Sequence, residues 1–141
     1  MTHRFRGERT LMRIFIGESD KCEHGKHRGL SLHEALLRFF RERGFAGCTV
    51  LRGIKGFGAS ARVHTVDILR LSLDLPVILE VVEEEEKIQE VLPDLDEMIG
   101  GGLITLERVR VILYRPANTP ANERWQHRIE GLEPNGGDAR D

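Results

Sequence analysis

The stretch GIKGFGASARVHT, residues 53–65, follows a strand-like run, CTVLRGI (48–54), and satisfies the pattern G-x-G-x-x-A of dinucleotide-binding turns. In that class of protein a helix begins directly after the glycines, and its N-terminus binds the pyrophosphate. Here the next pattern is LRLSLDLPVILEVV (69–82), which opens with leucines at every second position, the period of a strand. The sequence therefore argues against a dinucleotide fold and predicts a long connection between two strands.

Two amphipathic helices are predicted, one before the first of these strands in the chain and one after the second. LSLHEALLRFFRERG (30–44) carries one apolar stripe, and Ser31 with Glu34 three residues later predicts a capping box. EEKIQEVLPDLDEMIGGG (85–102) carries a second stripe, which continues past Pro93 and ends at three glycines. Further strands are predicted within TLMRIFIGE (10–18) and LITLERVRVILYR (103–115), while Pro76 marks an edge or an interruption of the third strand.

The order strand–helix–strand–strand–helix–strand predicts an α+β, ferredoxin-like βαββαβ sandwich: a four-stranded antiparallel sheet with two helices on one face. The other face stays partly apolar, at Leu11 and Phe15, so self-association is a natural way to cover it. We expect a mobile extension over residues 1–9, the domain over 10–115 and a polar, flexible tail over 116–141.

Composition narrows the class of protein. The chain has 141 residues, of which 40% are apolar, and a formal net charge of −2, which gives no reason to expect nucleic acid as a partner. No apolar run has the length of a membrane span, and the first residues have no apolar secretory segment. Cys22 and Cys48 form no disulfide framework, so a reduced, cytoplasmic protein is expected.

GIKGFG, followed by a loop that contains HT and by LP at the start of an apolar strand, resembles the PII signalling family. From about Leu11 to Tyr114 the chain also resembles the less-characterised PII-like branch, in which IGESD, TVLRGI, GFG, DLP and EEEEKI recur in similar form. The resemblance implies a homotrimer without enzymatic activity or required cofactor, which binds adenine nucleotides in clefts between subunits. It also implies a long effector loop, the T-loop, that acts on a partner such as a membrane transporter or an enzyme.

The resemblance also implies site residues. Gly56, Phe57 and Gly58 match the base of the T-loop beside the nucleotide, Gly100, Gly101 and Gly102 match a phosphate-binding loop, and Arg108 and Arg110 match two phosphate-binding arginines. Successive N–H groups of a glycine-rich turn can bind an anion, and arginines two positions apart on a strand project to the same side. The effector loop would be residues 55–75, with Lys55, Arg62 and His64 among its polar residues.

Departures from the PII pattern leave the ligand open. The 100–102 segment has no lysine, and Ala59 and Ser60 stand where PII proteins have Arg and Gln. Sensing of 2-oxoglutarate is therefore not expected, and the loop has no tyrosine for uridylylation. ATP, ADP, AMP and cyclic AMP stay open as ligands. The glycines could also be an ordinary helix stop, and Arg108 and Arg110 ordinary surface residues.

A metal-binding trimer of the copper-tolerance type is the alternative function. Cys22, His24 and His27 lie in one polar loop, residues 20–29, and could bind a soft metal. Their spacing is not a standard zinc pattern, and no fourth ligand is evident. A small hydrolase is a third hypothesis, although the sequence has neither a nucleophile elbow nor the asparagine that an acylphosphatase-like loop would need.

Overall fold

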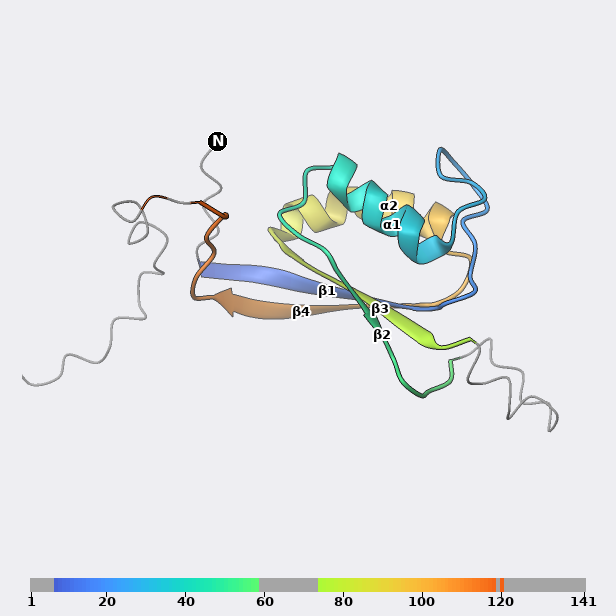
Figure 1. Cartoon of the computed structure of the whole chain (residues 1–141). Helices are drawn as coiled ribbons and strands as arrows, with labels where there is room; N and C mark the ends of the chain where they lie inside the picture. The colour runs from blue at the N-terminus through green and yellow to red at the C-terminus, as the bar shows by residue number, and fades with distance from the viewer. Residues whose placement is uncertain (1–6, 59–73, 119, 121–141) are drawn as a thin grey trace, which may run out of the picture. The chain divides into compact units, whose positions relative to one another are not determined.

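The computed structural model describes residues 7–58, 74–118 and 120 (Figure 1). The elements follow one another as β1 (Gly7–Gly17), α1 (Leu32–Glu42), β2 (Thr49–Arg52), β3 (Pro76–Glu83), α2 (Glu85–Met98) and β4 (Leu103–Val111). This is the predicted βαββαβ order, and the ferredoxin-like fold class is confirmed.

The four strands form one antiparallel sheet in the order β2-β3-β1-β4. β1 pairs with β3 from Thr10 opposite Glu83 to Gly17 opposite Pro76, and β2 pairs with the first half of β3. Figure 1 shows α1 and α2 on the same face of the sheet, as predicted. The ends of β2 and β1 and the start of β3 therefore meet at one end of the sheet.

Contacts divide the chain into two units, which are described separately. The first unit, Thr10–Glu107, contains both helices, β2, β3 and most of β1. The second takes the two ends of the chain, of which the structure describes 7–9, 108–118 and 120. Within the described residues, no helix is both long enough and apolar enough to cross a membrane.

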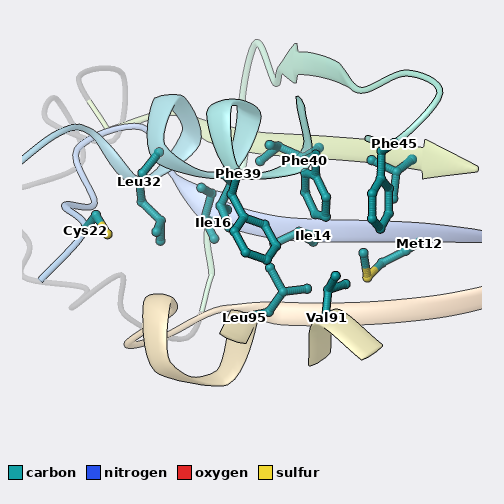
Figure 2. Packing of buried hydrophobic residues seen from close by; sticks show 14 of the residues in the cluster. Met12, Ile14, Ile16, Cys22, Leu32, Phe39, Phe40, Phe45, Val91 and Leu95 are labelled. Atoms are coloured by element: carbon teal, nitrogen blue, oxygen red, sulfur yellow. The ribbon is translucent and has the colours of Figure 1, made fainter. Parts of the chain in front are cut away.

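The core of the first unit lies between the helices and the sheet (Figure 2). Alternate residues of β3 are buried, as the two-residue period requires. Phe40 is fully buried, and its ring centroid lies 5.6 Å from that of Phe39 and 4.9 Å from that of Phe45. The largest fully buried side chains come from both layers: Phe40, Met12, Ile14, Leu32, Leu36, Leu79, Ile88 and Leu95.

Two strand predictions need correction. β1 begins at Gly7, three residues before the predicted start at Thr10. The prediction missed these residues because Glu8 and Arg9 give no apolar signal. Of the two alternatives predicted at Pro76, the edge strand is excluded, because Pro76 opens β3, which lies between β2 and β1. The other alternative, an interruption of a longer strand, involves residues 69–73, which lie outside the described residues. Proline is tolerated as the first residue of a strand, and here its carbonyl oxygen accepts a hydrogen bond from the Gly53 N–H at 2.7 Å.

The predicted capping box of α1 is also wrong. Ser31 occupies the N-cap position, but its side chain makes no capping hydrogen bond. Glu34 pairs instead with Arg38, at 3.2 Å between Oε1 and Nε. The Leu32 N–H at the helix start donates to the carbonyl oxygen of Asp20 at 2.7 Å, so the preceding loop provides an acceptor that the local sequence does not reveal.

Candidate functional site

The segment after β2 packs its glycines against the start of β3. A Cβ atom on Gly53 would lie 2.6 Å from Pro76 Cγ, and one on Gly56 would lie 3.0 Å from the same atom. Gly58 has open space around it, and the Phe57 side chain is 82% exposed. Gly53 and Gly56 therefore have a packing reason to be glycine, whereas Gly58 has none in the described structure.

The three glycines after α2 also differ in whether a side chain would have room. A Cβ on Gly102 would lie 2.6 Å from the carbonyl oxygen of Phe15 and 3.2 Å from Ile16 Cγ2. Gly100 and Gly101 are exposed, and a Cβ on either would meet nothing within 4 Å. Only Gly102 is explained by close approach to β1, so Gly100 and Gly101 stay available for another purpose.

The sheet brings these two glycine segments to one end. Gly56 lies against Pro76, which is paired with Gly17 at the end of β1. Gly102 lies against Ile16, the residue before Gly17. Their backbones therefore approach neighbouring strands at the same end of the sheet, although they are 46 positions apart in the chain.

The charged residues predicted for the site are distributed over several parts of the chain. Arg108 and Arg110 are exposed on β4 and belong to the second unit. Lys55 is exposed in the segment after β2. Arg62 and His64 lie outside the described residues, as does most of the predicted effector loop.

The structure does not bring Cys22, His24 and His27 together as metal ligands. Cys22 is buried in the core and its Sγ donates to the His24 carbonyl oxygen at 3.2 Å, while the His24 side chain is exposed. His27 Nε2 lies 3.4 Å from Glu42 Oε2. Across the part of the chain that the structure describes, no group of three or more His, Cys, Asp or Glu side chains could hold a metal ion.

The surroundings shift the pKa values of Glu42, which contacts the 20–29 loop, and of Cys48, which lies just before β2. The Lys26 ammonium, hydrogen-bonded at 3.2 Å, and then His27 lower the pKa of the Glu42 carboxyl. Burial raises the pKa of the Cys48 thiol to about 11. Cys48 is therefore a neutral thiol at pH 7, which is a poor nucleophile and a poor metal ligand.

A hollow of about 740 Å³ lies between the 20–29 loop and the end of α2. Three of its seven lining residues are acidic: Glu23, His24, Asp96, Glu97, Met98, Ile99 and Gly100. Three carboxylates would repel a phosphate. These acidic side chains therefore disfavour binding of a phosphate inside this hollow.

Glu18 and Asp74, to which the sequence alone assigned no role, lie at the same end of the sheet. Glu18 forms an ion pair with Arg52, the last residue of β2. Asp74, two residues before β3, accepts the Ser19 N–H at 2.9 Å. The motifs IGESD and DLP contained these carboxylates, but nothing local in either motif indicates that the two lie close together.

These features define an α+β protein of the PII-like, ferredoxin-like class. A solved structure from Thermus thermophilus, described as a PII-like signalling protein, matches with a TM-score of 0.50. The match covers 74% of this chain and 89% of that one, at 18% sequence identity, and shows likeness of fold. The sequence matches the DUF190 family, described as "Uncharacterized ACR, COG1993", over residues 9–111, and the chain belongs to this family.

Relatives from distant organisms support the assignment. A UPF0166 protein of Aquifex aeolicus is 37% identical over 105 residues, which cover 74% of this chain and 94% of the relative. A UPF0166 protein of Methanocaldococcus jannaschii is 39% identical over 97 residues, which cover 68% of this chain and 84% of the relative. The resemblance to the PII-like branch is confirmed for family and fold, and the roles of individual residues stay predictions.

Proposed function

We propose that this protein is a non-enzymatic, cytoplasmic signalling protein that binds a small anionic effector of the adenine nucleotide class. It acts as a homotrimer, with the effector in clefts between copies, and regulates a partner protein through residues 55–75. The partner is a membrane transporter or an enzyme. Support comes from the family and from the approach of the 56–58 and 100–102 segments to one end of the sheet.

Backbone chemistry is the basis of the proposed anion binding. A Cβ added to Gly58, Gly100 or Gly101 would have no neighbour within 4 Å, so a phosphate could approach the backbone of these residues closely. Successive N–H groups of such turns attract anions. In this proposal Arg108 and Arg110 contribute positive charge, since both are exposed on β4.

A nucleotide panel in a thermal-shift assay tests this function. A ligand at 100 times its Kd stabilises the folded state by about 2.7 kcal/mol, which raises the melting temperature measurably. We expect at least one of ATP, ADP, AMP and cyclic AMP to do so, and Arg108→Ala with Arg110→Ala to abolish the effect. No shift with any of the four at millimolar concentration would overturn the nucleotide proposal.

A matched control removes the same charge elsewhere. Arg38 and Arg41 are exposed on α1, so the double variant Arg38→Ala with Arg41→Ala lowers net charge equally. We expect this control to keep the nucleotide response. If both double variants lose the response equally, the arginines act through overall charge and the proposed role of Arg108 and Arg110 is wrong.

A further inference from the structure

One four-residue turn, Gly17–Asp20 (the 17–20 turn), contacts both ends of the connection between β2 and β3. At the β2 end, the Glu18 carboxylate pairs with the Arg52 guanidinium. At the β3 end, the Glu18 N–H donates to the Leu75 carbonyl oxygen at 2.9 Å, and the Ser19 N–H donates to Asp74 Oδ1 at 2.9 Å. Glu18 therefore contacts both ends, by its side chain and by its backbone.

The turn is itself held in shape. The Asp20 N–H donates to the Gly17 carbonyl oxygen at 3.1 Å, and Asp20 Oδ2 accepts the Gly17 N–H at 2.9 Å. A Cβ on Gly17 would lie 3.1 Å from Asp74 Oδ1 and 3.2 Å from Asp20 Oδ1, so the absence of a side chain leaves room for both carboxylates. The two aspartates use their side-chain oxygens to accept backbone N–H groups, which stabilises carboxylates that lie close together.

The two ends also contact each other. The Gly53 N–H donates to the Pro76 carbonyl oxygen at 2.7 Å, and Gly56 packs on the Pro76 ring. The position of Gly56 therefore depends on where Pro76 lies relative to β2. The 17–20 turn adds contacts to both sides of this junction, because it holds Arg52 on one side and Asp74 with Leu75 on the other.

We propose that the 17–20 turn is a clasp that positions the segment Gly56–Gly58 for effector binding, with Glu18, Arg52 and Asp74 as positioning residues. This inference rests on the proposed function for its ligand. Its mechanical part, the fixing of the two ends of the β2–β3 connection, is independent of any ligand. The clasp residues lie outside the segments proposed to bind the anion.

The clasp is separable from folding stability. The Arg52 side chain is 65% exposed and the Glu18 side chain 26% exposed, and ion pairs of this kind contribute little to the stability of the whole fold. Their effect is local, because they decide how often the ends of the connection separate. Substitution should thus change local opening and effector affinity while leaving global unfolding nearly unchanged.

The test combines hydrogen exchange, nucleotide affinity and melting temperature for Glu18→Gln and Asp74→Ala. We expect amide exchange of residues 53–58 and 74–75 to accelerate roughly threefold to tenfold in each variant. Nucleotide affinity should fall by a similar factor, with the melting temperature within about 2 °C of the unsubstituted protein. The charge reversal Glu18→Arg with Arg52→Glu should restore slow exchange in part.

Two controls make the outcome specific. Asp74→Asn keeps an acceptor oxygen for the Ser19 N–H and should retain most of the slow exchange. Glu34→Gln removes an exposed ion pair on α1 and should change neither exchange at 53–58 nor affinity. Unchanged exchange in both clasp variants would overturn the clasp, and faster exchange with unchanged affinity would overturn its positioning role. If the unsubstituted protein binds no nucleotide, the proposed function and the positioning role fail, and exchange alone decides the clasp.

Discussion

Gly102 lies so close to β1 that a side chain would collide with the strand backbone. A Cβ there would come within 2.6 Å of the Phe15 carbonyl oxygen, whereas Gly101 has open space. The sequence presents GGG as one feature and cannot separate a packing requirement from backbone exposed for a ligand. The distinction appears only when β1, far away in the chain, is placed beside the segment.

Gly102→Ala and Gly101→Ala form a matched pair at the residue scale. We expect Gly102→Ala to lower the free energy of unfolding by about 1–3 kcal/mol, because the methyl group overpacks a site against fixed backbone. Gly101→Ala should change it by less than about 0.5 kcal/mol, as surface substitutions usually do. Urea denaturation of both variants checks this, and equal losses would contradict the assigned packing role.

At the scale of elements, one buried carboxylate at the junction of β3 and α2 binds the connection between α1 and β2. Glu83 is 3% exposed, and its Oε1 accepts the Ala46 N–H at 2.8 Å and lies 3.6 Å from Lys87 Nζ. Lys87 Nζ also donates to the Gly44 carbonyl oxygen at 2.6 Å and lies 5.1 Å from the centroid of the Phe45 ring. These contacts fix the connection from α1 to β2.

Glu83→Leu is therefore expected to be strongly destabilising. The change leaves the Ala46 N–H without its acceptor and Lys87 without its nearest carboxylate, so we expect a loss of about 2–4 kcal/mol in the free energy of unfolding. Glu83→Gln keeps an acceptor oxygen and should lose roughly half as much. Chemical denaturation measures both, and a Leu variant as stable as the unsubstituted protein would refute this account of the junction.

Prediction from sequence succeeded for elements with a strong local signal. The apolar stripes located α1 and α2, and alternation located β3, because periodicity is set by burial on one face. The prediction failed where contacts with residues distant in the chain determine the local structure. The N-terminus of α1 uses the carbonyl oxygen of Asp20 in place of a capping box, and the edge-strand alternative at Pro76 is excluded because Pro76 opens an inner strand.

For the whole molecule, the sheet face opposite the helices combines apolar and charged residues. Phe15 is paired with Ile78, and on the same face Arg13 binds Glu80 and Glu107, each at 3.0 Å. The hydrogen bond to Glu80 raises the pKa of Arg13, which stays charged. Arg13 already has two carboxylate partners. A second copy of the chain could therefore cover this face without burying an unpaired positive charge.

Leu51→Asp tests whether this face joins the copies of the proposed homotrimer. Leu51 is 43% exposed and opposite Ile78 in the register, so a carboxylate there should disrupt association and yield monomers in sedimentation velocity. The neighbouring Val50 is 37% exposed and opposite the buried Leu79, on the other face. Val50→Asp should keep the oligomer, and a trimer that survives Leu51→Asp would argue against this interface.

The βαββαβ order was predictable for the whole molecule because each element carries its own pattern. The approach of the two glycine segments was not, since it depends on the pairing of β1 with β3. The family resemblance pointed to both segments. The structure shows in addition which of their glycines are required by close packing. The sequence does not name the proposed effector, because Ala59 and Ser60 depart from the PII pattern, and both lie outside the described residues.

Isothermal titration calorimetry of the protein with ATP, ADP, AMP and cyclic AMP tests the central claim most directly. The nucleotide recovered after each titration is also analysed. The account predicts saturable binding of at least one nucleotide, with one site per chain, and recovery of that nucleotide unchanged. Flat titrations with all four up to millimolar concentration would contradict effector binding. Stoichiometric binding followed by steady conversion of the nucleotide would contradict a non-enzymatic sensor.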